Sequence, residues 1–118
     1  MTNRTYTAPG LTEAEAAIRQ LDGTACSEVV FEDASRRRLI VAAGPEQFVV
    51  EMADGAGGRW RVVDPTKGQE PVRLVVAGAA GDYPAYRCVS LDAALEATRA
   101  FLSGEGERSA QLMWSMIG

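Results

Sequence analysis

Near each end of the chain, mainly apolar residues recur at the three- and four-residue spacing of one face of an α-helix. The first such stretch covers residues 12–21 and carries Ala14, Ala17, Ile18 and Leu21 at the apolar positions. The second covers residues 91–102 and carries Leu91, Ala94, Leu95, Thr98, Phe101 and Leu102. The pattern predicts two amphipathic helices, each short enough to need a sheet to pack on.

Residues at the ends of both stretches indicate where the helices begin and end. Thr12 and Glu15 have the spacing of a capping box, so the first helix is predicted to begin at Thr12. Gly23 is a typical residue for ending this helix. Ser90 is predicted to cap the second helix, and Gly104 is predicted to end it.

Between the helices the pattern changes to alternation of apolar and polar residues, which is the period of a β-strand. Strands are predicted near residues 28–32, 38–41, 48–52, 59–62, 72–76 and 83–89. Residues 1–10 are predicted to form a short arm or a first irregular strand, and 111–114 a short returning strand. The short connections favour hairpins. The expected fold is therefore α+β, one domain over residues 1–118, with a mainly antiparallel meander and an N-terminal and a C-terminal helix packed on it.

The predicted core combines the apolar faces of the helices with the inward positions of the strands. Its expected members are Val50, Trp60, Leu74, Leu95, Phe101 and Leu102.

Composition narrows the range of partners. The 118 residues are 47% hydrophobic, which suits one folded domain with one core. The net charge of −4 argues against nucleic acid as the main partner and is compatible with a basic protein partner. No apolar run approaches the roughly 18 residues of a membrane helix, and the N-terminal residues lack the apolar stretch of a signal peptide. We therefore expect a cytoplasmic protein without a membrane partner.

Histidine is absent from the chain, which excludes Ser-His-Asp and Cys-His catalysis and HExxH zinc sites. Cys26 and Cys88 lie far apart and do not form a CxxC motif, so we expect reduced thiols, no metal site and no cofactor. The Gly-rich segment 54–58 lies between two predicted strands, which favours a hairpin turn over a phosphate-binding loop. A second Gly-containing segment, 78–81, is predicted to be another break between strands.

Charged residues on the predicted strands suggest two surfaces. The basic run Arg36–Arg38 is interpreted as strand residues paired with Glu28, Glu32 and Glu51, in preference to a nucleic-acid patch. The second surface is an acidic edge near strand ends and loops, made of Glu51, Asp54, Asp64, Glu70 and Asp82. Tyr83 and Tyr86 flank Pro84 beside this edge, where they suit either an interface hot spot or a packed strand.

The block from Ser90 to Trp114 resembles the closing segment of immunity-protein family one of bacterial polymorphic toxin systems. The residues that carry the resemblance are the pair Ala94-Leu95, Phe101, Gly104 or Gly106, Arg108 and Trp114. The chain departs from the family pattern at Ser109, where Pro is common, and in a longer turn over 104–108. The resemblance implies a non-enzymatic α+β protein without catalytic residues, which binds and blocks a toxin encoded beside it, commonly a nucleic-acid deaminase.

Two functions therefore remain open. The first is an immunity protein that covers the active site of a deaminase toxin. Its expected toxin-binding residues are Glu51, Asp54, Asp64, Asp82, Tyr83 and Tyr86. The alternative is a small-molecule ligand-binding domain, or an enzyme that uses carboxylates and tyrosine alone.

Overall fold

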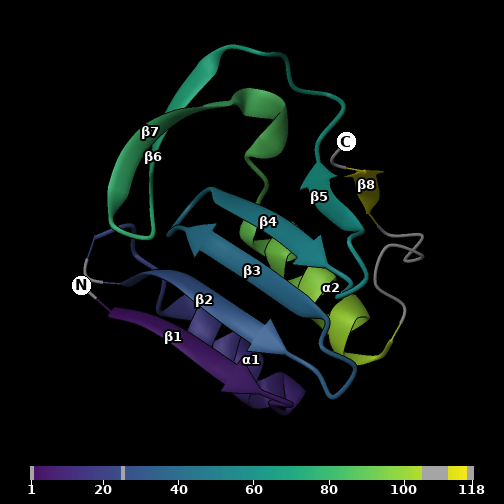
Figure 1. The fold of residues 1–118 in the computed structure, drawn as a ribbon. Coiled ribbons are helices and arrows are strands. Elements are labelled where there is room, and N and C mark those ends of the chain that lie inside the picture. The colour runs from purple at the N-terminus through teal and green to yellow at the C-terminus, as the bar shows by residue number, and fades with distance from the viewer. Residues whose placement is uncertain (1, 25, 105–111, 117–118) are drawn as a thin grey trace.

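A twisted six-stranded sheet forms the centre of the molecule in the computed structural model (Figure 1). The structure describes residues 2–24, 26–104 and 112–116. The strand order is β1-β2-β3-β4-β5-β8. The strands are β1 (Thr2–Thr7), β2 (Cys26–Glu32), β3 (Arg38–Ala43), β4 (Phe48–Ala53), β5 (Arg59–Val63) and β8 (Met113–Met116). All neighbouring pairs are antiparallel except β1 with β2, so the mainly antiparallel α+β prediction is confirmed.

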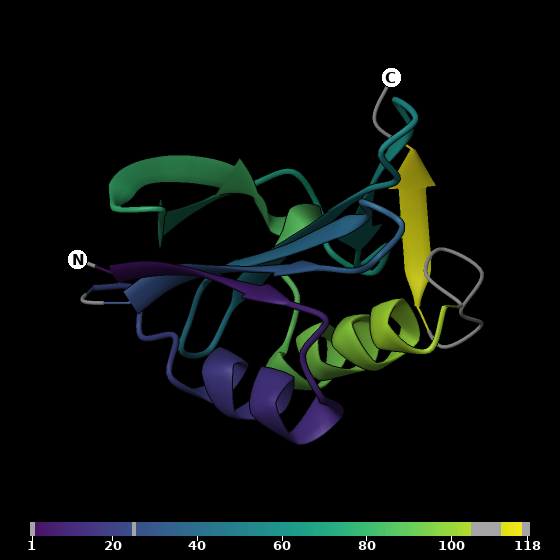
Figure 2. The same ribbon diagram turned by 60° about the horizontal axis from the view of Figure 1, so that its bottom comes forward.

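Both helices, α1 (Leu11–Arg19) and α2 (Leu91–Leu102), lie against the same face of this sheet (Figure 2). α1 connects β1 to β2, and this crossover is what allows the two strands to run parallel. The N-terminal segment is therefore an edge strand, with a shift of register between Thr2 and Asn3. None of the described helices combines the length and apolar character needed to cross a membrane.

The hairpin of β6 (Pro71–Val76) and β7 (Ala79–Pro84) forms a separate two-stranded sheet on the side opposite the helices (Figure 2). Its turn is Ala77-Gly78, with φ of 51° and 85°, the left-handed conformation that type I′ hairpin turns require. Ser27 in β2 links it to the main sheet, because its Oγ accepts the Gly78 N–H at 2.9 Å.

Two predicted boundaries in this region are wrong. The expected break at 78–81 is mostly strand β7, because a two-residue turn suffices to reverse the chain. The expected strand over 83–89 ends at Pro84, which lacks an N–H for the strand ladder, and the 3₁₀ turn η1 (Ala85–Arg87) follows.

The core lies between the main sheet and the helices. Its largest fully buried side chains include Phe31, Phe48, Phe101, Ile18, Leu21, Leu39 and Met52. Of the predicted core residues, Val50 and Phe101 are buried, while Trp60, Leu95 and Leu102 are half-buried and pack against the core. Leu74 is placed wrongly by the sequence, because β6 belongs to the separate hairpin and Leu74 is half-buried there, outside the core.

The two helix starts differ from each other in their capping. Ser90 caps α2 as predicted, because its Oγ accepts the Ala93 N–H at 3.1 Å. The capping box predicted at Thr12 is wrong. α1 begins at Leu11 after Gly10, which has no side chain to offer, so Thr12 already lies inside the first turn.

This difference predicts that two similar substitutions change the stability of the protein by different amounts. Ser90→Ala should lower the free energy of unfolding by about 1 kcal/mol, because the Ala93 N–H loses its acceptor. Thr12→Ala should change it by less than about 0.5 kcal/mol, because Thr12 is exposed and does not cap α1. Urea denaturation of both variants checks this. Equal midpoints for Ser90→Ala and the parent would contradict the assigned cap.

Candidate functional site

Four of the six predicted site residues lie around η1. Arg87 in η1 connects two of them: its Nη2 donates to Glu51 Oε2 at 2.8 Å, and its guanidinium lies 5.5 Å from the centre of the Tyr83 ring. The Asp64 N–H donates to the Tyr86 carbonyl at 2.7 Å. We call Glu51, Asp64, Tyr83, Tyr86 and Arg87 the η1 surface. All five are half-buried.

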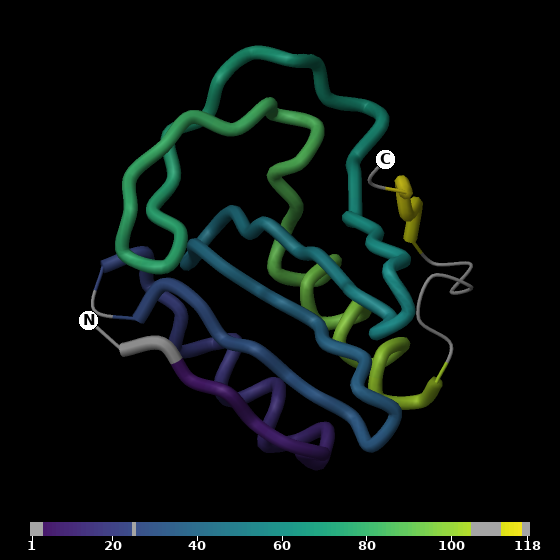
Figure 3. Tube along the Cα trace, viewed as in Figure 1, coloured from purple at the N-terminus to yellow at the C-terminus, as the bar shows by residue number. Residues whose placement is uncertain are grey.

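Backbone contacts hold η1 in place where the chain returns from the hairpin to α2 (Figure 3). The Ala85 and Tyr86 N–H groups donate to the carbonyls of Glu70 and Gly68, both at 2.9 Å. After η1, Val89 exchanges two backbone hydrogen bonds of 2.8 Å with Phe48 in β4. The segment that carries the two tyrosines is therefore fixed to the β5–β6 connection on one side and to β4 of the main sheet on the other.

The Glu51 carboxylate is already paired. It accepts from Arg59 at 3.2 Å and from Arg87 at 2.8 Å, and its side chain is 23% exposed. With two arginines around one half-buried carboxylate, Glu51 does not present an open negative charge to a partner. Glu51 instead holds Arg87, whose guanidinium lies over the Tyr83 ring.

Asp64 has an open carboxylate oxygen. Its Oδ1 accepts the Thr66 hydroxyl at 2.6 Å and the Thr66 N–H at 3.0 Å. Hydrogen bonds from the Thr66 hydroxyl and N–H lower the pKa of Asp64, so the group is ionised at neutral pH. Its Oδ2 accepts no hydrogen bond from any residue that the structure describes.

The other two predicted residues, Asp54 and Asp82, are not part of the η1 surface. Asp54 follows β4 and precedes β5, whereas Asp64 comes after β5, so the two carboxylates are at opposite ends of that strand. Asp54 Oδ1 accepts the N–H groups of Ala56 and Gly58, each at 2.8 Å, in the predicted hairpin turn. Asp82 is exposed on β7 and faces Arg73 of β6 at 3.6 Å.

Two arginines of the basic run form ion pairs, and one of them, Arg38, has a partner that the sequence predicted. Arg38 pairs with Glu32 at 3.7 Å, across the β2–β3 ladder. Arg37 pairs with Asp33 at 2.7 Å, a partner that the sequence did not identify, and its guanidinium lies 5.3 Å from the centre of the Phe101 ring. Glu28 forms no ion pair within the described part of the chain. The pairing of Arg37 and Arg38 with carboxylates lowers their availability for phosphate.

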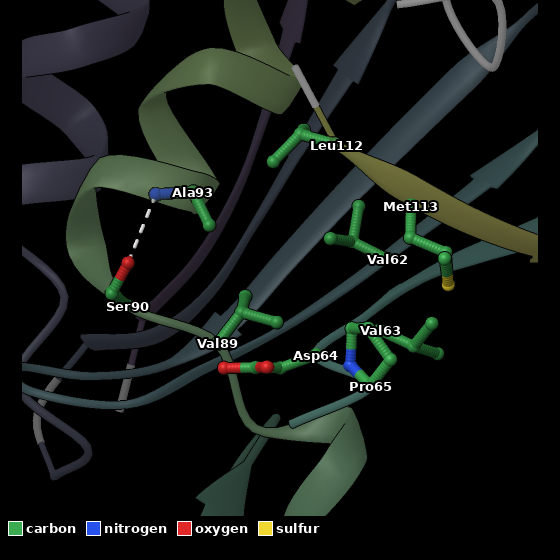
Figure 4. A pocket seen from close by; sticks show the side chains of 9 residues that line it. All are labelled: Val62, Val63, Asp64, Pro65, Val89, Ser90, Ala93, Leu112 and Met113. Carbon is green, nitrogen blue, oxygen red and sulfur yellow. Dashed lines mark hydrogen bonds between the residues drawn. The ribbon is translucent and has the colours of Figure 1, made fainter. Parts of the chain in front are cut away.

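A cavity of about 230 Å³ adjoins Asp64 (Figure 4). The residues that line it are Val62, Val63, Asp64, Pro65, Val89, Ser90, Ala93, Leu112 and Met113. Sequence reasoning found Asp64 and missed the cavity, because its walls come from segments that are distant along the chain. A second cavity, of about 360 Å³, lies between β6 and the β3–β4 connection, next to Pro45 and Leu74.

The two cysteines are separate from each other and unpaired in this structure. Cys26 is half-buried and Cys88 is buried, and both are free thiols. Burial raises the pKa of the Cys88 thiol, which favours its protonated form. Among residues 2–24, 26–104 and 112–116, no three His, Cys, Asp or Glu side chains are grouped to hold a metal ion.

Some residues that the sequence singled out lie outside the described residues. They are Glu105, Gly106, Glu107, Arg108 and Ser109.

The family comparison covers the site and the fold together. Comparison with curated proteins finds no match to this chain. The family model described as "Immunity protein Imm1" matches residues 3–116, which includes both helices, the hairpin and the η1 surface. Since the match extends over almost the whole chain, the protein belongs to the Imm1 family of immunity proteins.

Proposed function

We propose that this protein neutralises a nucleic-acid deaminase toxin of a polymorphic toxin system, in the cytoplasm, by covering the toxin's active site. Membership of an immunity-protein family supports binding and neutralisation of a cognate toxin. The mode of action is occlusion without turnover of a substrate. The observation that carries this mode is the η1 surface, which presents two tyrosines from a segment fixed to the sheet.

The negative charge of the protein supports a target enzyme that acts on nucleic acids. A deaminase that acts on DNA or RNA binds a polyanion and presents a positive groove to it. The immunity protein carries a net charge of −4, with a pI of about 4.8. Opposite charges on the two proteins accelerate their encounter and align them before contact.

The η1 surface suits the centre of such an interface. Tyrosine is enriched among residues that dominate binding energy, and Tyr83 and Tyr86 stand within four residues of each other. The backbone hydrogen bonds of η1 reduce the entropy that would otherwise be lost on binding. We propose that the interface buries about 1,200–2,000 Å², with Asp64 and Asp82 near the tyrosines and Asp54 at its periphery.

Binding kinetics separate the roles of the tyrosines and the carboxylates. Tyr86→Ala is expected to raise the dissociation rate of the toxin complex by about 10- to 100-fold, because a rigid aromatic contact is lost. Asp82→Asn should mainly slow association and weaken its salt dependence, because Asp82 is exposed. Surface-binding kinetics at two salt concentrations measure both rates.

Asp54→Asn is the matched control, since it removes the same charge at the far end of β5 and retains the oxygen that caps its turn. Its association rate should change less than that of Asp82→Asn. If Tyr86→Ala dissociates at the parental rate, the toxin is held by another face.

The function itself is tested with the toxin domain encoded next to the gene of this protein. The two proteins should co-purify, and stoichiometric immunity protein should abolish deamination of single-stranded DNA or RNA by the toxin. A complex that retains full deaminase activity would overturn occlusion. Neutralisation of a toxin with a different chemistry would overturn the deaminase target alone.

A further inference from the structure

The walls of the cavity beside Asp64 come from three parts of the fold and combine apolar side chains with polar groups. Val62 at the end of β5 and Val89 before α2 are almost fully buried. Figure 4 shows Ser90 and Ala93 of the α2 start on one side, with Leu112 and Met113 on the other. Met113 is 53% exposed, and its flexible thioether can adapt to an entering group.

Asp64 supplies the charge at this cavity. Its Oδ1 accepts two hydrogen bonds from Thr66, while its Oδ2 accepts no hydrogen bond from the described residues. Lys67 is close enough to lower the pKa of Asp64, but its ammonium donates to the Cys88 carbonyl at 2.7 Å and forms no ion pair with Asp64. The positive end of α2 at Ser90 is offset by Asp92 in the first turn.

The size of the cavity suits a protein side chain. Small-molecule pockets typically measure about 300–1,000 Å³, and this cavity, at about 230 Å³, lies below that range. Lys and Arg are the side chains whose chemistry matches its walls, because their aliphatic stems pack on apolar surface while the cationic head seeks an anion.

We propose that this cavity receives one basic side chain of the toxin, with its stem against Val63, Leu112 and Met113 and its cationic head at Asp64 Oδ2. The inference rests on the proposed function and adds to it the chemistry of one toxin residue that determines specificity. A basic side chain from the rim of a nucleic-acid groove would thereby be withdrawn from the toxin's substrate.

The first test is Asp64→Asn, measured against the catalytically inactive toxin domain encoded beside the gene. Asn retains the oxygen that Thr66 requires and removes the charge, so the turn is preserved. We expect the dissociation constant to rise by about 10- to 100-fold, mainly through faster dissociation. Asp22→Asn, whose carboxylate also accepts two backbone hydrogen bonds in a turn and which lies outside the proposed interface, should change it by about threefold or less.

A double-mutant cycle identifies the toxin residue. Each surface Lys and Arg of the toxin is changed to Met, alone and together with Asp64→Asn. One toxin substitution should weaken binding strongly to the parent and little to Asp64→Asn, since the two changes remove the same contact. Met retains an unbranched apolar side chain, so the cycle reports the energetic contribution of the cationic group.

Filling the cavity gives a second variant that does not depend on Asp64. Ala93→Leu should weaken binding by about tenfold, because the added side chain occupies the space of the basic stem. Ala16→Leu on the exposed face of α1 is its control, and thermal melts of both variants verify folding.

The outcomes distinguish the two proposals. If the parent binds and inhibits the toxin while Asp64→Asn binds with parental affinity, or every toxin substitution is additive with it, the cavity proposal is overturned and the proposed function stands. If the parent neither binds nor inhibits the toxin, both are overturned.

Discussion

Phe101→Ala is expected to lower the free energy of unfolding by about 3–5 kcal/mol. Phe101 is 1% exposed, and its ring packs in the core between α2 and the main sheet. Removal of the ring leaves a cavity that close-packed neighbours cannot fill, in addition to the lost burial of apolar surface. The Arg37 guanidinium, 5.3 Å from the ring centre, also loses its aromatic partner.

Leu102→Ala is the matched control for this variant, because it truncates the next residue of the same helix, whose side chain is only half-buried. Its cost should be about 1–2 kcal/mol. Urea denaturation gives both values. A parental midpoint for Phe101→Ala would show that Phe101 does not occupy the core position described here.

Gly44→Ala is expected to lower the free energy of unfolding by about 2–5 kcal/mol, through backbone strain and a steric clash. Gly44 has φ of 90°, a conformation that residues with a side chain rarely adopt. An added Cβ would lie 2.5 Å from the Leu21 carbonyl oxygen, so the contact between the β3–β4 connection and the end of the α1 segment would have to open.

Gly57→Ala separates the two contributions. Gly57 also has a positive φ, 99°, but an added Cβ there would meet no atom within 4 Å. Its cost should be about 1 kcal/mol, which represents the strained backbone alone. Thermal and urea unfolding compare the two variants. Equal destabilisation would contradict the close approach of Gly44 to Leu21.

The η1 surface and the neighbouring cavity give the proposed interface two kinds of contact. Tyr83 and Tyr86 offer aromatic area from a fixed segment, while Asp64 offers a single charge beside a small cavity. In the proposed complex the tyrosines supply much of the affinity, and the cavity selects the toxin that carries a basic side chain at the matching position.

Local patterns in the sequence were sufficient for most of the individual elements. The three- and four-residue spacing of apolar positions predicted α1 and α2 to within about two residues, and alternation predicted β2 to β5. Ser90 and the turn at 54–58 were also identified correctly, since a cap or a hairpin turn depends on residues only a few positions apart. The absence of histidine excluded several catalytic classes without any structure.

Errors arose where a local pattern did not determine the exact start of an element or the sheet that a strand joins. Thr12 and Glu15 have the spacing of a capping box, but α1 begins one residue earlier, at Leu11. The segment 78–81 is rich in small residues, which suggested a break, although Ala79 and the residues after it pair regularly with β6. Leu74 has the alternation of a core strand, and alternation does not say which sheet the strand joins.

The sequence by itself determined the fold class, the helices, most of the strands and the family. Tertiary structure alone decided the parallel pairing of β1 with β2, the separation of the β6–β7 hairpin from the main sheet, and the composition of the site. Glu51 meets Arg87 across 36 positions of the chain, and the cavity joins Val62 to Leu112. Such contacts depend on how whole elements pack, because packing energy is shared among residues that no local spacing relates to one another.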